Sequence, residues 1–216
     1  MDRQLELLLG KYPDLAGIAA DIEKACALLL GCYRSGGMVL ICGNGGSAAD
    51  AEHLVGELMK GYLSPRPVPA AVRAALAAAF PDDAPYLAAH LQGALPTFSL
   101  ASQMSLITAI ANDTAADMIF AQQVYGYGRP GDVLVAISTS GNSPNILRAA
   151  QVARALGLGV LGFTGRSGGG LHPLCTVSIR VAADLTSDVQ ESHLALYHAI
   201  CAIIEGSFFN DKTVLA

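Results

Sequence analysis

Five short apolar segments, separated by longer stretches of helical character, constrain the fold of this chain more than any other feature. They lie at residues 37–42, 97–101, 132–137, 158–164 and 176–181. Several of them are apolar at every position and not at alternate positions, which is typical of strands that are covered on both faces. Strands that alternate with helices favour parallel pairing, because a helix makes each return to the next strand. The sequence therefore predicts an α/β fold with a mostly parallel sheet between layers of helices.

The stretches between the apolar segments carry the helical pattern. They predict an N-terminal pair of helices before Ser35 and further helices at 46–60, 102–111, 117–127, 144–156 and 187–208. We interpret residues 1–216 as a single domain, because a chain of this length corresponds to about one domain of ordinary size. Within it we distinguish the N-terminal helices (1–35) and an insertion (63–96).

The insertion is marked by proline. Six of the ten prolines interrupt the alternation of strands and helices there, at Pro65, Pro67, Pro69, Pro81, Pro85 and Pro96. Between them, the alanine-rich stretch 70–80 predicts a short helix, because proline ends a helix on either side. A connection of this length is typical of an insertion that packs on the protein surface. We expect surface packing, with a lid or a subunit contact as the alternative.

Composition and charge exclude several classes of partner. Eighteen acidic and thirteen basic residues give a net charge of −5, which disfavours nucleic acid and anionic membranes as partners. Hydrophobic residues make up 52% of the chain and charged residues only 14%, so we expect apolar surface that meets another subunit in a homo-oligomer. No apolar run reaches the roughly 18 residues that span a bilayer, and no secretory signal is visible. We therefore expect a cytoplasmic protein without a membrane partner.

A glycine-rich loop follows the first predicted strand, at residues 42–50. Its glycines, Gly43, Gly45 and Gly46, let the backbone turn tightly and approach a ligand. The start of the next helix offers unpaired amides and a positive dipole end to an anion. The loop lacks the spacing of a dinucleotide-binding fingerprint and the Gly-Lys-Ser/Thr of a P-loop. Taken alone, it fits a tight turn without a ligand equally well.

A second loop, at 137–145, follows another apolar strand and carries four hydroxyl side chains: Ser138, Thr139, Ser140 and Ser143. Ser143 is placed to cap the next helix, since Pro144 occupies the first helical position. Capping explains one hydroxyl but not the other three. Hydroxyls and helix amides coordinate a phosphate without arginine, at the edge of a parallel sheet where ligands bind. The two loops together predict a site for a sugar phosphate.

Histidine and carboxylate side chains lie on two predicted helices, the first of which begins at the first loop. His53 and Glu57 are four residues apart and share one helix face, although such a pair is also common as a solvated surface couple. Gln190 and His198 are eight residues apart, about 80° around a helix, so one broad face presents both. His193 is about 140° from His198, and we expect it to be satisfied by packing or by a neighbouring subunit.

These motifs together resemble the SIS (sugar isomerase) superfamily and, within it, the phosphoheptose isomerases. The matching residues are Gly43-Asn44-Gly45-Gly46-Ser47 followed by His53 and Glu57, Ala111-Asn112-Asp113, Ser138 to Ser143, Thr164-Gly165-Arg166, and Gln190-Glu191 with His193 and His198. The resemblance covers nearly the whole chain except the insertion. It implies a three-layer αβα sandwich with a five-stranded parallel sheet, N-terminal helices that pair subunits, usually as a tetramer, and sites at subunit interfaces.

The resemblance also implies an activity. It is an aldose–ketose isomerisation through an enediolate, from sedoheptulose 7-phosphate to D-glycero-D-manno-heptose 7-phosphate, at the entry to heptose biosynthesis. Glu57 matches the base that moves the carbon-bound proton, and His198 matches the general acid/base at oxygen. The positions that match substrate contacts are Asn44, Gly45, Gly46, Ser47, Asp113, Ser138, Thr139, Ser140, Ser143 and Gln190.

In some members of the family a zinc ion is bound by residues that match His53, Glu57, Gln190 and His198. If zinc binds Glu57, that carboxylate is not a fully free base and the metal polarises substrate oxygens instead. The sequence leaves both uses open.

The chain also departs from the family in three places. Lys60-Gly61-Tyr62 stands where an arginine is common, Leu185-Thr186-Ser187-Asp188 replaces a Thr-Ala-Arg type sequence, and the insertion is unusual. These departures bear on which sugar is bound more than on the type of reaction.

Two alternatives stay open. One is an isomerase of another phosphosugar on the same scaffold. The other is a non-catalytic SIS module, either a sugar-phosphate sensor or an adaptor for a replication initiator. Glu57 and His198 are present, whereas adaptor-type members tend to lose the matching residues, so we favour the enzyme.

Overall fold

The five predicted strands form one parallel sheet in a computed structural model that describes residues 2–209. The strands are β1 (Val39–Cys42), β2 (Thr97–Ser99), β3 (Val133–Ile137), β4 (Gly159–Thr164) and β5 (Val177–Arg180). Their order across the sheet is β2-β1-β3-β4-β5, and every neighbouring pair is parallel. Each strand lies inside one of the five apolar segments, so the predicted α/β class and the five-stranded parallel sheet are confirmed.

Helices occupy the intervening stretches. They are α1 (Arg3–Lys11), α2 (Ala19–Arg34), α3 (Gly46–Met59), α4 (Ala70–Ala79), α5 (Ala84–His90), α6 (Met104–Asp113), α7 (Ala121–Tyr127), α8 (Pro144–Ala155) and α9 (Thr186–Phe209), with 3-10 turns at Pro13–Ile18, Ala116–Met118 and His172–Leu174. The single helix predicted at 117–127 is wrong, because a 3-10 turn precedes α7 there and Phe120 between them is buried. None of the helices within residues 2–209 is both long and apolar enough to cross a membrane.

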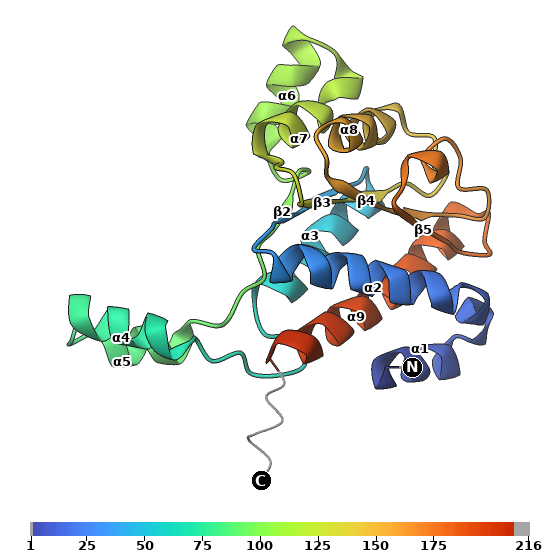
Figure 1. Cartoon of the computed structure of the whole chain (residues 1–216). Coiled ribbons are helices and arrows are strands. Elements are labelled where there is room, and N and C mark those ends of the chain that lie inside the picture. The colour runs from blue at the N-terminus through green and yellow to red at the C-terminus, as the bar shows by residue number, and fades with distance from the viewer. Residues whose placement is uncertain (1, 210–216) are drawn as a thin grey trace.

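The strands are covered on both faces, which is why they are apolar throughout (Figure 1). Val39 and Ile41 of β1 face a core shared with α2, α3 and α9. Leu40 and Cys42 point the other way, into a second core with α7 and α8. Successive side chains of a strand point to opposite faces, so a fully apolar run fills both cores. Helices therefore form the outer layers and the sheet forms the middle one.

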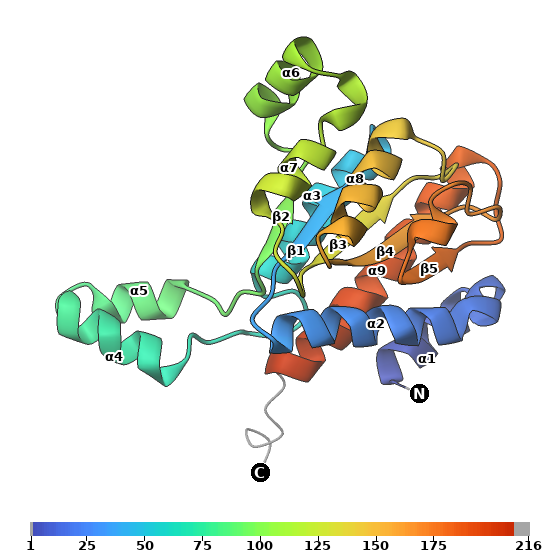
Figure 2. The ribbon, with the colours of Figure 1, turned by 45° about the horizontal axis from the view of Figure 1, so that its top comes forward.

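The insertion behaves differently from its prediction. Its alanine-rich stretch is helical, as expected, and pairs with α5 as a hairpin. Figures 1 and 2 show this hairpin extending away from the sheet. Only Ala84 is buried in the two helices, so the expectation that the insertion packs on the surface is wrong for α4 and α5. Large apolar side chains of the hairpin, including Val72, Phe80 and Tyr86, stay exposed in this chain, and a lid or subunit contact stays a prediction.

Candidate active site

The two predicted loops lie side by side at the carboxyl ends of β1 and β3, which are neighbours in the sheet. From β1 the chain crosses to β2 on one side, while β3 lies on the other side. Ligands of open parallel sheets bind at such a reversal of strand order. Gly45 precedes α3 with φ of +56°, a conformation that glycine adopts without strain. The first loop can therefore turn directly into the helix, with the amides of Ser47 and Ala48 bonded to the carbonyls of Asn44 and Gly45.

A cavity of about 330 Å³ separates the two loops, and we call it the cradle. Eight of the ten predicted substrate contacts line it, together with Ile137 and Thr186: Asn44, Gly45, Gly46, Ser47, Ser138, Thr139, Ser143 and Gln190. None of these ten lining residues carries a formal charge. The cradle therefore offers hydroxyls, amides and a helix start, which are donors suited to a phosphate.

Ser143 occupies the predicted cap position of α8, but its hydroxyl makes no hydrogen bond to the helix. Instead, the Ser143 Oγ lies 3.1 Å from the Ser138 Oγ. The expected side-chain cap is therefore wrong, and the physical reason is that the hydroxyl turns toward the cavity. Each hydroxyl is held by the other, and both stay at the wall of the cradle.

A reciprocal amide pair ties the two loops together. The Asn44 side chain donates to Asn145 and accepts from it, with both N···O distances at 2.9 Å. Sequence reasoning missed Asn145, although its place directly after Pro144 in the second loop was a usable signal. The pair fixes the width of the cradle at one end.

Two predicted contacts lie outside the cradle. The Ser140 hydroxyl accepts a hydrogen bond from the Asn142 backbone amide at 3.1 Å and so serves its own turn. Asp113 ends α6, is exposed, and accepts from the Asn112 side chain at 2.8 Å. Within this chain, neither side chain lines the cavity that holds the other eight.

The predicted acid/base residues converge on a second cluster, the histidine cluster, defined by His53, Glu57 and His198. The His53 Nε2 lies 3.3 Å from the Glu57 Oε1 and 3.4 Å from the His198 Nε2. The Tyr62 ring stacks on His198 with ring centres 5.8 Å apart. A carboxylate from α3 and an imidazole from α9 therefore meet, as the sequence predicted.

The helices α3 and α9 run side by side from the cradle to the histidine cluster. Near the start of both, Gly46 approaches the Gln190 amide so closely that a Cβ there would overlap it. Further along, His53 meets His198. The eight residues from Gln190 to His198 correspond to about 12 Å of helix rise. Gln190 thus lies with the cradle, while the other three predicted metal ligands lie together about two turns away.

Burial changes the proton affinity of several groups near the cluster. It lowers the pKa of His198 below the ordinary histidine value, and the neighbouring His53 lowers it further. Burial raises the pKa of Asp50, against the effect of a hydrogen bond from the Tyr197 hydroxyl. His193 is completely buried, with Nε2 at 3.3 Å from the Thr164 carbonyl, and burial lowers its pKa to about 4. The prediction that packing or a neighbouring subunit satisfies His193 is therefore confirmed in part: its Nε2 has a partner, whereas its Nδ1 is buried without one among the described residues.

The donor chemistry of the histidine cluster suits zinc only in part. Ligands at about 2.0–2.1 Å around a tetrahedral zinc are about 3.4 Å apart, which resembles both distances from the His53 Nε2. The Glu57 Oε2 is buried without a hydrogen-bond partner. Among residues 2–209, however, no group of three or more His, Cys, Asp or Glu side chains is arranged to hold a metal ion. The donor atoms therefore have spacings near those of a zinc site without forming one in this arrangement.

A buried ion pair, which sequence reasoning missed, joins the ends of α3 and α9. The Arg66 guanidinium donates to the Glu205 Oε1 at 2.7 Å and to the carbonyls of Leu58 and Glu57 at 2.7 and 2.9 Å. Burial alone would raise the pKa of Glu205, but backbone amides, led by Tyr62, and Arg66 hold that pKa below its usual range. The pair fixes the helix turn that carries Glu57, and a lone arginine in a proline-rich segment gave no signal for it.

Comparisons with known proteins agree with this geometry. The model of the SIS domain family matches residues 15–78 and 74–165. A phosphoheptose isomerase of Rhodospirillum rubrum is 41% identical over 191 residues, which cover 88% of each chain. The solved structure of a phosphoheptose isomerase from Francisella tularensis has a TM-score of 0.74 at 30% identity, over 90% of each chain. That of a phosphoheptose isomerase from Neisseria gonorrhoeae has a TM-score of 0.67 at 34% identity, over 86% of each.

Proposed function

Because this chain belongs to the SIS domain family and, within it, to the phosphoheptose isomerases, we propose that it interconverts sedoheptulose 7-phosphate and D-glycero-D-manno-heptose 7-phosphate. The observation that carries the proposal is the pairing of two sites on α3 and α9. An uncharged cradle lies at the start of these helices, and a carboxylate–imidazole cluster lies further along. A sugar with a phosphate at one end and a reactive carbonyl at the other requires both.

In the proposed reaction the cradle binds the phosphate through the hydroxyls of Ser138 and Ser143 and the amides at the start of α3. Glu57 takes the proton from the carbon next to the carbonyl and returns it to the adjoining carbon, so the carbonyl moves by one position. His198 donates a proton to the carbonyl oxygen and removes one from the neighbouring hydroxyl. One carboxylate and one imidazole thus balance the proton transfers of an aldose–ketose isomerisation.

We also propose one zinc ion per site, held by His53, Glu57 and His198; Gln190, the fourth predicted ligand, lies with the cradle in this chain and is not part of the proposed set. When bound, zinc would polarise the substrate oxygens as a Lewis acid. The separations of the donor atoms support this proposal. Zinc content after purification, compared between the wild type and His53→Ala, tests it: equal metal content in both proteins would contradict the assignment.

The proposed assembly is a homo-oligomer, most simply the tetramer that the family resemblance implies, in the cytoplasm. Large apolar side chains exposed on three separate helices support it, namely Leu7 on α1, Met104 on α6 and Leu194 on α9. Contact between subunits would bury this area, because apolar surface favours removal from water. Sedimentation at micromolar concentration measures the assembly, and a monomer would refute it.

The function is tested by incubating the purified protein with sedoheptulose 7-phosphate and following the aldose product by NMR. Wild-type protein should turn the sugar over, and Glu57→Gln and His198→Ala should each lose about 10²–10⁴-fold in rate. No turnover by the wild type, with inorganic phosphate or another phosphosugar still bound, would refute the substrate and favour a sensor. Unchanged rates in both variants would keep the reaction but overturn the roles of Glu57 and His198.

A further inference from the structure

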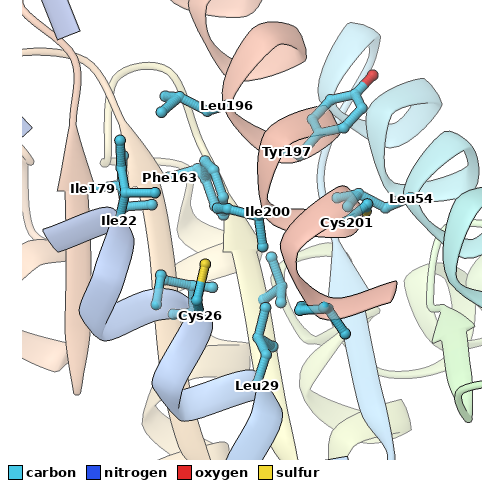
Figure 3. Close-up of a cluster of buried hydrophobic side chains, with 14 of the residues drawn as sticks. Ile22, Cys26, Leu29, Leu54, Phe163, Ile179, Leu196, Tyr197, Ile200 and Cys201 are labelled. Carbon is cyan, nitrogen blue, oxygen red and sulfur yellow. The ribbon is translucent and has the colours of Figure 1, made fainter. Parts of the chain in front are cut away.

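A chain of three polar side chains, His53, Tyr197 and Asp50, extends from the histidine cluster along the contact between α3 and α9. The Tyr197 hydroxyl lies 2.9 Å from the His53 Nδ1 and 3.2 Å from the Asp50 Oδ1. In Figure 3, the Tyr197 ring lies among the buried apolar side chains between α9 and α3, near Leu54. The neighbours of Tyr197 in that cluster are apolar, so its hydroxyl depends on Asp50 and His53 for hydrogen bonds.

The count of protons in this chain allows only one arrangement in which both hydrogen bonds of the Tyr197 hydroxyl form. A carboxylate accepts hydrogen bonds and donates none, and a tyrosine has one proton to give. The second oxygen of Asp50, Oδ2, is already buried without a partner. If Tyr197 donated to His53 instead, Asp50 would lose its one side-chain hydrogen bond as well. Asp50 is half-buried, and a carboxylate that loses its donor there is costly, so Tyr197 donates to Asp50.

The direction of that bond determines the tautomer of His53. Since the Tyr197 oxygen has given its proton to Asp50, it meets the His53 Nδ1 as an acceptor, and Nδ1 must carry the proton. A neutral imidazole has one N–H, so the other nitrogen, Nε2, presents its lone pair. That nitrogen is the one that faces the Glu57 Oε1 at 3.3 Å and the His198 Nε2 at 3.4 Å.

We propose that Asp50 and Tyr197 are positioning residues that hold His53 in the Nδ1–H tautomer, with the Nε2 lone pair directed into the histidine cluster. In this tautomer His53 accepts a proton from His198 or shares a cation with Glu57. In the opposite tautomer, the Nε2 proton would occupy Glu57, and that carboxylate would be a weaker base. The catalytic consequence rests on the proposed function, whereas the tautomer itself does not.

Nitrogen-15 NMR of histidine-labelled protein tests the tautomer directly. The spectrum is recorded on metal-free protein at a pH about two units above the ordinary histidine pKa of about 6.5, where a free imidazole is neutral. The wild type should show the Nδ1–H pattern for His53. Tyr197→Phe keeps the ring and removes the hydroxyl, so the pattern should become that of a mixture. An Nε2–H pattern in the wild type, or an unchanged pattern in Tyr197→Phe, would overturn the proposal.

Asp50→Asn provides the sharpest variant, because an amide can donate. The asparagine would donate to the Tyr197 oxygen, Tyr197 would donate to the His53 Nδ1, and His53 would change to the Nε2–H tautomer. This reversal requires the same fold, which the unchanged resonances of other histidines would confirm. A role confined to packing would leave the tautomer of His53 as it is in the wild type, and that result would refute the proposal.

The matched control is Tyr33→Phe, which removes another buried tyrosine hydroxyl, 2.7 Å from the Thr97 Oγ1 and outside the cluster. It should leave the His53 pattern and the turnover unchanged. A second readout is zinc affinity, which loss of an outer partner of a ligating histidine typically weakens about 10–100-fold. If the substrate proposal fails, the NMR result still decides the tautomer, so the two failures are distinguishable.

Discussion

The cradle and the histidine cluster share the helices α3 and α9 but are built in opposite ways. The residues lining the cradle are uncharged, and eight of the ten come from two loops, each a short continuous stretch of sequence; Thr186 and Gln190 come from α9. The histidine cluster joins Glu57 and His198, which are far apart in the sequence, and a buried ion pair braces it. The cradle uses neutral hydrogen-bond donors near the surface. The histidine cluster uses ionisable side chains that tertiary packing brings together.

This difference indicates which substitutions should reduce stability and which should reduce substrate binding. Removing a neutral hydroxyl donor changes the folding free energy little, because a typical hydrogen bond contributes about 1 kcal/mol. Buried charged groups are costly when a partner is removed. We therefore expect changes near the cluster to affect stability, and changes at the cradle to affect substrate binding alone.

The largest expected effect comes from Arg66→Met. It leaves Glu205 buried without its cation, and breaking a buried pair in this way costs about 3–5 kcal/mol of folding free energy. Denaturant unfolding monitored by circular dichroism measures the loss. The double variant Arg66→Met with Glu205→Leu should recover part of it, because no charge is then left unpaired. A single-variant loss below about 1 kcal/mol would mean that the cluster is no more sensitive than the cradle.

The second effect is a loss of folding stability in acid. It comes from His193, which lies on the inner face of α9 between Gln190 and His198. Its pKa of about 4 in the folded protein is below the ordinary value of about 6.5. The unfolded chain therefore binds a proton that the folded protein does not, and stability falls as the pH drops from about 6.5 to 4. The loss amounts to about 3 kcal/mol when complete.

Unfolding free energies measured across this pH range in the wild type and in His193→Gln test the assignment. The variant should lose most of this slope because glutamine does not titrate. The exposed His172→Gln serves as the control and should keep the wild-type slope. If the slopes of all three proteins coincide, burial of His193 is not the source of the acid sensitivity.

At the cradle, Ser143→Ala should raise KM about tenfold, equivalent to about 1.4 kcal/mol of binding, and leave kcat and stability nearly unchanged. The reason is that the hydroxyl faces the cavity and caps nothing. Ser140→Ala removes a hydroxyl of the same loop that lies outside the cavity, and its KM should stay within about twofold, a change of about 0.4 kcal/mol. Steady-state kinetics would contradict this picture if the two variants behaved alike.

The smallest effect is expected where the cradle meets α9. Gly46→Ala places a Cβ against the Gln190 amide and pushes that side chain aside. Since the end of a side chain moves easily, stability should change by less than about 1 kcal/mol, while KM rises about threefold. Gly56→Ala, on the same helix but facing open space, should not change KM. An unchanged KM for Gly46→Ala would show that Gln190 does not contribute to the cradle.

The fold was predictable because its signals are local. Each strand is an apolar run, and each run lies between stretches of helical pattern, so the class and the five strands follow from short segments. The direction of the hairpin α4–α5 was not predictable, since no local pattern in residues 63–96 specifies which surface its exposed apolar side chains contact. The 3-10 turn before α7 was missed because Phe120 serves the core and not the helical repeat.

The sequence by itself determined the uncharged donors of the cradle and the spacing of His53, Glu57 and His198 on two helices. It also determined that α3 begins at the first loop, because turn residues act over a few positions, whereas the tertiary structure placed the start of α9 beside the cradle. Only the tertiary structure decided that the Ser143 hydroxyl leaves its helix, that Gln190 lies with the cradle, and that Asp50, Tyr197 and Arg66 support the histidine cluster. These are contacts between residues distant in the chain, and packing of side chains, not local preference, selects them.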